Sequence, residues 1–382
     1  MRPVSIAGTF QLPVKKCHPQ SVRALGAEVV KGVMAAAGRE EVDAVYLGNM
    51  LSDELQSQKH LASLVADEAG LAGVEALQVR AATASGAAAL RMGYLAVASG
   101  AAESVIVAGV EKMSDQSPVL ALAKALDAEQ EVPDGATMLS QNARLMALYG
   151  ERYGVAPEAF AGFALNAHRN ARHNPHALFQ EKVVTREMVL NSRLIVPPLR
   201  LYDCSPICDG AAAVLLVPAA GGEHPSGPRV RILASAVATD RFRMRDRSDP
   251  LQLAAAGRSA QKAMAQAGLT PAAIDFFEVH DAFSIMACLQ LEAAGFARPG
   301  EGWRLASEGA IRREGAIPIA TMGGLKARGH PIGATAVYQA CEIVAQLTGT
   351  AGANQLPGPT SALQQSVGGG GATIITHIFG LW

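Results

Sequence analysis

The chain has 382 residues, of which 49% are hydrophobic and only 5% aromatic, and it contains 38 glycines. This length and composition predict an alanine-rich α/β protein with a large core and two domains or one doubled domain. With 33 basic and 34 acidic residues the net charge is −1, so the charge balance gives no reason to expect a nucleic acid or an acidic membrane surface as partner.

Residues 1–7 lack an apolar secretory run and no stretch is long enough to span a bilayer, so a cytoplasmic protein is expected. Five scattered cysteines in a chain of this length argue against a disulfide framework. Cys204 and Cys208 are too widely spaced for a metal-binding pair and have no partner pair. We therefore expect both to be buried thiols and predict no metal site.

Strands and helices alternate in the first part of the chain. Apolar residues at helical spacing predict helices at 20–37, 58–70 and 84–99. Short apolar runs predict strands at 4–9, 42–47, 76–80 and 104–109. This alternation predicts a parallel sheet that is covered by helices on both faces.

Residues 111–200 do not continue the alternation of strands and helices, and their sequence predicts two helices at 139–153 and 157–170. They are expected to form a long insertion in the first α/β unit, which a strand at 211–217 then closes. Residues 221–228 have the composition of a linker.

The rest of the chain repeats the first plan, which predicts an internal duplication. Strands are expected at 230–237, 274–279, 317–321 and 372–378, and helices at 251–268, 283–295 and 332–347. In a sheet of this kind the functional site lies at the carboxyl ends of the strands, where both halves would contribute turns.

Thr83 stands in such a turn, between a short strand and an alanine-rich helix. The first N–H groups of a helix have no intrahelical partner and the helix dipole favours negative charge, so a side chain here is well placed to act as a nucleophile or to bind an anion. A plain helix N-cap is the alternative interpretation, because short motifs of this kind often have no further function.

Two other turns carry histidines, and a third is rich in glycine. His280 and His330 each follow a strand and precede a helix, and Pro331 suits the first helical position after His330. Either histidine taken alone is compatible with a structural role. Gly368, Gly369 and Gly370 precede the last strand and would offer backbone N–H groups that a substrate can approach closely.

Taken together, these segments resemble the thiolase family, in particular the branch of sterol-carrier-protein thiolases and archaeal and bacterial acetyl-CoA acetyltransferases. The resemblance covers nearly the whole length and is carried by residues 79–90, 109–113, 198–212, 278–283 and 323–335. It implies a five-layered α-β-α-β-α thiolase fold built from two duplicated βαβ halves. The implied domains are an N-terminal half (1–110 and 201–220), an inserted loop domain (111–200) and a C-terminal half (229–382).

The resemblance also implies roles for individual residues. His330 would be the base that activates the nucleophile, His280 would polarise the thioester oxygen, and the turn at 368–370 would add oxyanion-binding N–H groups. His60 stands where this branch often has a histidine. The implied chemistry is a Claisen condensation or its reverse, with a coenzyme A thioester as substrate and no covalently bound cofactor.

Thr83 departs from the family pattern, because the family carries its acylated cysteine at this position. A helix N-terminus and a histidine can lower a thiol pKa from about 8.5 to near neutrality, whereas a threonine hydroxyl would need full general-base help, as in a serine triad. A second departure is the segment 319–322, where the family usually has an asparagine and a proline.

Three functions remain open from the sequence. The chain is expected to be an acyl-CoA C-acyltransferase, altered or inactive because of Thr83. The alternatives are a retro-aldolase acting on acyl-CoA thioesters, whose relatives tend to use tyrosines near the two histidine positions, and a non-catalytic acyl-CoA-binding or scaffold subunit that pairs with a small OB-fold zinc-ribbon protein. A homodimer or dimer of dimers is expected, because the strand at 104–109 would otherwise be an open apolar edge.

Overall fold

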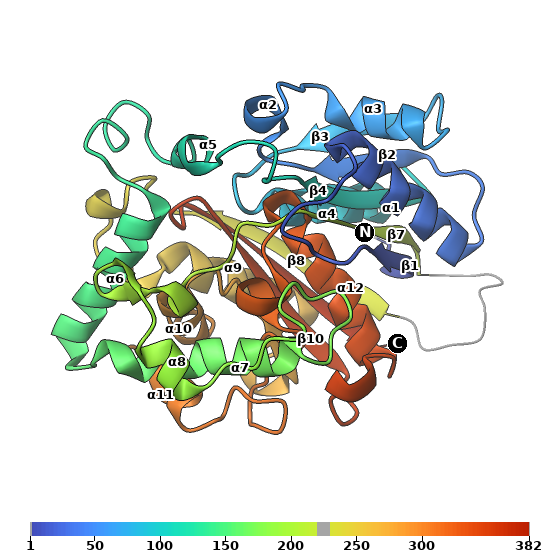
Figure 1. Cartoon of the computed structure of the whole chain (residues 1–382). Helices are drawn as coiled ribbons and strands as arrows, with labels where there is room; N and C mark the ends of the chain where they lie inside the picture. Colours follow the sequence, from blue (N-terminus) through green and yellow to red (C-terminus); the bar gives the residue numbers. More distant parts are fainter. Residues whose placement is uncertain (1, 220–229, 382) are drawn as a thin grey trace.

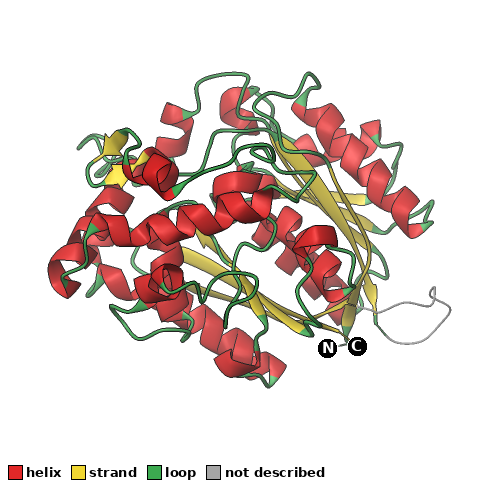
Figure 2. Cartoon of the chain, turned by 60° about the horizontal axis from the view of Figure 1, so that its bottom comes forward, coloured by secondary structure: helices red, strands yellow, loops and turns green. Residues whose placement is uncertain are grey.

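The computed structural model describes residues 2–219 and 230–381, so the linker predicted at 221–228 lies outside the described residues. A nine-stranded mixed sheet runs through the molecule in the order β3-β2-β4-β7-β1-β8-β11-β10-β9, with helices on both faces (Figures 1 and 2). Its strands are β1 (Val4–Gln11), β2 (Ala44–Gly48), β3 (Glu75–Val79), β4 (Val105–Glu111), β7 (Gly210–Pro218), β8 (Val230–Thr239), β9 (Phe276–Glu278), β10 (Ser361–Gly368) and β11 (Thr373–Leu381).

The two halves of the sheet repeat one strand order. The halves meet where β1 pairs with β8, and outward from this contact the strands run β1-β7-β4-β2-β3 on one side and β8-β11-β10-β9 on the other. Each half thus places its first strand innermost and its last strand next to it. Beyond β9, Ile319 forms a single bridge with Phe277, in the place that β3 takes beside β2. The predicted duplication is therefore confirmed.

Helices fill three layers around the two halves of the sheet (Figure 1). The first half is covered on its outer face by α1 (Val22–Ala37) and α3 (Leu61–Glu68). The outer face of the second half is covered by α9 (Ala254–Ala267) and α10 (Ser284–Ala293). Between the halves lie α4 (Ser85–Ser99) and α12 (Thr335–Leu347), which share one apolar core with both. The layers are α-β-α-β-α, as the resemblance implied.

The prediction of a parallel sheet is only partly right. The β3-β2-β4 set and the β9-β10 pair are parallel, but β7, β1, β8 and β11 pair antiparallel with their neighbours. A tight glycine turn joins β10 to β11, and two strands joined by so short a connection must be antiparallel. The sequence prediction also missed β10, whose polar residues Gln364, Gln365 and Ser366 lack the apolar pattern of a buried strand.

The prediction that the strand at 104–109 forms an edge of the sheet is wrong. The strand predicted at 104–109 is β4, which lies inside the sheet between β2 and β7. The edge of the first half is instead β3, whose residues are partly buried or exposed. Pairing of β4 with β7 could not be foreseen because about a hundred residues separate the two strands along the chain.

No strand forms at 317–321, contrary to the sequence prediction. The side-chain amides of Asn166, Asn170 and Asn174 donate to the carbonyls of Ile319, Ala320 and Met322 at 2.8 to 3.0 Å. Asn166 and Asn170 belong to α7 (Ala161–Ala171), and Asn174 follows it. Because these carbonyls bind asparagine side chains, they are not available to a neighbouring strand, and only the bridge at Ile319 remains.

The residues between β4 and β7 carry α7 and several other elements. These are α5 (Val119–Ala123), α6 (Met138–Tyr153), α8 (Arg186–Leu190), β5 (Leu194–Val196) and β6 (Leu199–Arg200). Two further short helices lie elsewhere, α2 (Ser52–Leu55) and α11 (Gly302–Ser307). Within residues 2–219 and 230–381 no helix has the length and apolar character needed to cross a membrane.

Candidate active site

Thr83 lies in a strained turn between β3 and α4. Ala82, directly before it, adopts a left-handed backbone conformation with φ of 49°, which a residue with a side chain rarely takes. Ala84 caps α4 and the helix begins at Ser85. The Ser85 hydroxyl donates to the Ala82 carbonyl at 2.6 Å and accepts from the Ala81 N–H at 3.0 Å, and these bonds hold the turn in this shape.

The glycine turn after β10 binds the Thr83 hydroxyl directly. Thr83 Oγ1 donates to the carbonyl of Val367 and accepts from the N–H of Gly369 at 3.1 Å. At Gly368 a side chain would meet the Ala81 carbonyl at 2.8 Å, so glycine is required where this turn approaches the first half. Gly370 faces elsewhere, toward the side chain of Gln141 in α6. Thr83 is thus hydrogen-bonded to Val367 and Gly369 of the other half, and Gly368 allows the close approach between the halves.

His280 and His330 form a second group. Their rings stand perpendicular with centroids 5.0 Å apart, and both side chains are buried. His330 Nδ1 is 2.7 Å from Thr335 Oγ1 at the start of α12, and the backbone of His280 is held by the side chain of Gln290. Among the described residues, Nδ1 of His280 has no hydrogen-bond partner. One ring nitrogen is therefore free to bind a ligand or a proton.

The surroundings keep both histidines neutral. Burial lowers the pKa of His280 to about 3, and the charge of Arg328 adds to this effect. Burial also lowers the pKa of His330 well below its usual value, with contributions from His280 and Arg328. Arg328 is itself buried and paired with Glu342 at 3.0 Å. A neutral imidazole can accept a proton, so the pair has the protonation state that a base requires.

The turns that carry Thr83 and His330 meet at the centre of the molecule, as the sequence predicted. The carbonyl of Gly333 points into a socket formed by Gly48, Gly86 and Gly109, where an added Cβ would come within 2.8, 2.5 and 2.6 Å of it. Gly48 ends β2, Gly86 lies at the start of α4 and Gly109 lies in β4. Three elements of the first half therefore pack closely against the loop after His330. No hydrogen bond among the described residues joins Thr83 to His280 or His330.

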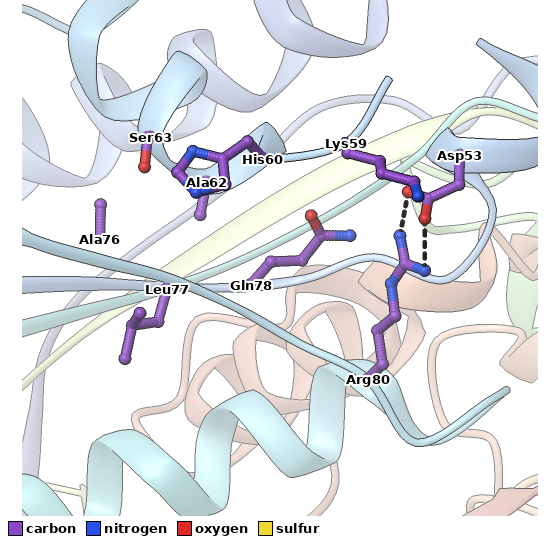
Figure 3. A pocket seen from close by; sticks show the side chains of 9 residues that line it. All are labelled: Asp53, Lys59, His60, Ala62, Ser63, Ala76, Leu77, Gln78 and Arg80. Atoms are coloured by element: carbon purple, nitrogen blue, oxygen red, sulfur yellow. Dashed lines mark hydrogen bonds and ion pairs between the residues drawn. The ribbon is translucent and has the colours of Figure 1, made fainter. Parts of the chain in front are cut away.

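His60 lies apart from these groups. It caps α3 in a left-handed conformation with φ of 60° and lines a pocket of about 390 Å³ beside β3. Figure 3 shows its ring next to Ser63, while Arg80 pairs with Asp53 across the pocket. No described hydrogen bond, ion pair or ring contact connects His60 with Thr83, His280 or His330. The structure therefore does not bring this residue into the central group.

The thiols of the chain offer no substitute nucleophile near the histidines. Cys208 accepts the backbone N–H of His330 at 3.2 Å, but it is buried and burial raises its pKa to about 12. Cys204 is only partly buried, rather than buried as predicted, and burial raises its pKa to about 11. Cys288 and Cys341 are buried in α10 and α12. Within the described chain no group of three or more acidic, cysteine or histidine side chains is arranged to hold a metal ion.

Sequence reasoning gave no role to Glu111, which lies at the end of β4 against this site. Its Oε2 accepts from the N–H groups of Gly333 at 3.0 Å and Met50 at 2.9 Å, and its Oε1 accepts from Leu51 and Asn49. The sequence does contain a signal for this residue, because an acidic side chain stands at the end of an otherwise apolar strand. A carboxylate that is buried with such a strand needs several hydrogen-bond donors around it, so its position indicates a network of polar contacts.

Both halves of the chain match models of known protein families. Residues 4–220 match the model described as "Thiolase, N-terminal domain", and residues 236–381 match "Thiolase C-terminal domain-like". The chain is similar to an acetyl-CoA acetyltransferase of Methanothermobacter thermautotrophicus, with 43% identity over 99% of this chain and 100% of the relative. An acetyl-CoA acetyltransferase of Methanocaldococcus jannaschii is 36% identical over 99% of both chains.

Two further comparisons broaden this set. Sterol carrier protein 2 of Bos taurus is 31% identical over 88% of this chain and 64% of its own length. Among solved structures, one described as "Ltp2-ChsH2(DUF35) aldolase" superposes with a TM-score of 0.86 at 25% identity, covering 99% of this chain and 97% of the other. Relatives with two kinds of activity in their names thus share this fold.

Proposed function

Because the chain belongs to the thiolase family, we propose that it binds acyl-CoA thioesters and carries the apparatus of a C-acyltransferase in which the nucleophilic step is altered or lost at Thr83. The acetyl-CoA acetyltransferases that cover its full length support the substrate class. Coenzyme A thioester is the substrate in this proposal, and no covalently bound cofactor takes part.

The observation that carries the proposal is the bonding of the Thr83 hydroxyl. Its proton goes to the Val367 carbonyl rather than to a histidine, and its oxygen accepts the N–H of Gly369. A hydroxyl needs a base within hydrogen-bond reach before it can attack a thioester. Thr83 therefore lacks the activation that an acylated side chain requires, and it also uses an N–H that a thioester oxygen would otherwise bind.

The remaining parts suit thioester chemistry. We assign His330 as the base and His280 as the group that polarises the thioester oxygen, since the two neutral rings adjoin each other and His280 Nδ1 is unpartnered among the described residues. Gly368 and Gly369 would supply the oxyanion-binding backbone once Thr83 is replaced by a side chain that releases them. His60 and Gly370 have no role in this assignment, because they face other surroundings.

The deciding experiment is intact-protein mass spectrometry after incubation with acetyl-CoA and acetoacetyl-CoA, beside an assay of thiolysis. The unmodified protein is expected to bind acetyl-CoA in calorimetry but to form no acyl adduct and show little turnover. Thr83→Cys should acylate at residue 83 and gain thiolysis, and adding His330→Ala should remove that gain. Thr83→Ser is the matched control, because it keeps an alcohol. An acyl adduct on Thr83 with brisk turnover would refute the proposal.

A retro-aldolase is the second candidate, favoured by the superposition with a structure described as an aldolase. In this reaction a β-hydroxyacyl-CoA is cleaved to a carbonyl compound and a shorter acyl-CoA, and no acyl-enzyme is needed. Release of a carbonyl compound by the unmodified protein, lost in His280→Ala, would favour this candidate over the first.

We also propose two protein partners. A homodimer would form through β3, whose outer edge pairs with no other strand among residues 2–219 and 230–381. A small OB-fold zinc-ribbon protein is the second partner, and the superposed aldolase structure, whose name pairs Ltp2 with a second component, supports this expectation. If neither acylation nor cleavage occurs, co-purification with such a protein would support a role as a non-catalytic acyl-CoA-binding or scaffold subunit.

A further inference from the structure

Four buried polar side chains stand in register across the inner face of the second half of the sheet. Glu278 of β9 is paired with Gln364 of β10, Gln364 with His377 of β11, and His377 with Ser235 of β8. Residues in register on adjacent strands point to the same face, so these side chains form one row, here named the inner polar row. Glu278, Gln364 and His377 are 0% exposed.

The row faces the two central helices. Gln364 donates to the Ala336 carbonyl of α12 at 2.6 Å, and Arg91 of α4 donates to Ser235 Oγ at 3.1 Å. One turn along α12, Gln339 donates to the Val279 carbonyl at 3.0 Å and so lies beside Glu278. The row and Gln339 are therefore enclosed between β8–β11 and the helices that begin at the candidate active site.

Five polar atoms in this enclosure have no hydrogen-bond partner among the described residues. They are Glu278 Oε2, Gln339 Oε1, Gln364 Oε1, and Nδ1 and Nε2 of His377. A buried polar atom without a partner loses its hydration and regains nothing, so native structures rarely leave one unpaired. Five such atoms at one place would offset much of the stability of a domain.

Exchanging the amide or ring atoms of these side chains does not supply the missing bonds. Both glutamine amides donate to backbone carbonyls, which only accept, so their Oε1 atoms cannot be exchanged for nitrogen. Burial lowers the pKa of His377 to about 3, so its ring is neutral and offers one donor and one acceptor. Burial and the nearby carboxyl of Glu342 raise the pKa of Glu278, which favours its protonated form and adds a second donor. Within the row and Gln339, three acceptors still share two donors, and the unpartnered hydroxyl of Ser366, two residues after Gln364 on β10, offers one more donor. A ligand that both donates and accepts can bond these side chains at once.

We propose that the inner polar row and Gln339 bind ordered internal water. A buried water makes about three hydrogen bonds, so roughly two molecules would satisfy the five atoms. Water is favoured over a monovalent cation because the guanidinium of Arg91 reaches the same row at Ser235. The row lies against α12, where the Ala336 carbonyl accepts from Gln364.

The location gives this water a positioning role. Glu278 precedes His280 by two residues, and α12, which carries Gln339, begins directly after the loop of His330. Water held between Glu278 and Gln339 therefore joins the strand of one histidine to the helix of the other. The inference does not depend on the proposed reaction, because it rests only on the buried atoms.

A crystal structure at a resolution that locates ordered solvent is the direct test. Density for water within hydrogen-bond distance of at least two of the five atoms is expected. A dry row in which the same side chains bond one another would overturn the proposal. So would density with the short contacts and high coordination of a metal or alkali cation.

Magnetic relaxation dispersion of water ¹⁷O counts long-lived internal waters in solution and gives a second test. His377→Phe should lose the waters that this ring binds. Thr376→Val is the matched control, because Thr376 is the neighbouring buried residue but points to the opposite face, where its hydroxyl bonds Ser259 at 2.8 Å. Equal counts in the unmodified protein and His377→Phe would contradict the proposal. If His377→Phe fails to fold, the crystal structure of the unmodified protein still decides.

Discussion

The carboxylate of Glu111 accepts the backbone N–H of Gly333 at 3.0 Å and thereby joins the end of β4 to the loop that carries His330. The carbonyl of Gly333 packs into the socket formed by Gly48, Gly86 and Gly109 of the first half. The position of His330 thus depends on contacts made by the half of the molecule that holds Thr83. The two groups of the candidate site are coupled through this loop rather than through a direct side-chain bond.

Glu111→Gln should lower the free energy of unfolding by about 2–4 kcal/mol, because the amide NH₂ would face backbone N–H groups and leave buried donors unpaired. Burial raises the pKa of Glu111 to about 7, so ionisation costs stability as the pH rises through this value, while the N–H groups of Met50, Leu51 and Gly333 oppose the shift. Urea unfolding at about pH 6, below this pKa, is therefore the measurement. Glu103→Gln, at an exposed ion pair, is the control and should change little. Equal stability of both variants would contradict the assigned role.

Gly86→Ala should displace the His330 loop, because the new Cβ would lie 2.5 Å from the Gly333 carbonyl. We expect a loss of about 1–3 kcal/mol in stability from this overpacking. In the Thr83→Cys background it should also reduce any acyl transfer that this variant gains. Gly257→Ala is a suitable control, since its single close contact is 3.2 Å and it lies in α9. A Gly86→Ala crystal structure with an unmoved loop would disprove the displacement.

The sequence predicted those parts of the fold that depend on local pattern. Apolar periodicity located α1, α4 and α12 to within three residues at either end, and the turns before α4 and α12 located Thr83 and His330 at the central meeting point. The thiolase resemblance supplied the layer order, which is confirmed. These features follow from spacing and from motifs that the chain itself contains.

The missed features depend on contacts between distant residues. The segment at 317–321 has the apolar pattern of a strand, but asparagines some 150 residues earlier bind its carbonyls. The polar strand β10 is stable because it is buried between β9 and β11. The bonds of Thr83 to Val367 and Gly369 likewise join residues that no local pattern relates. The roles assigned to Thr83, His280 and His330 stay predictions until the acylation experiment is done.

Leu77→Lys should weaken the proposed homodimer. Leu77 lies in the edge strand β3 and is 44% exposed, so a dimer through this edge would bury it, and a lysine on each copy would add like charges there. Analytical ultracentrifugation at micromolar concentration should show the unmodified protein as a dimer or tetramer and the variant shifted toward monomer. Met188→Lys is the matched control, because Met188 is 40% exposed and belongs to α8, which lies at the opposite side of the molecule from β3 (Figure 1). A monomeric unmodified protein would refute the dimer itself.

His168 gives a prediction about stability and pH. It is buried in α7, with the ring of Tyr202 at 5.4 Å and that of Phe179 at 5.5 Å. Burial lowers its pKa from 6.5 to about 4, and the charges of Lys182 and Lys326 add to this effect. The folded protein therefore binds a proton at His168 less readily than the unfolded chain does. The stability that this group contributes is complete above about pH 6.5 and is lost as the pH falls toward 4.

At about pH 5 this difference corresponds to about 2 kcal/mol, taking 1.36 kcal/mol per pKa unit. His168→Gln removes the titrating ring, so its stability should fall less than that of the unmodified protein between about pH 7.5 and about pH 5, by roughly this amount. Urea unfolding at the two pH values measures the change. His173→Gln is the matched control, because His173 is exposed and follows the same helix. If His168→Gln and His173→Gln lose the same stability on acidification, the buried ring of His168 is not the source of the effect.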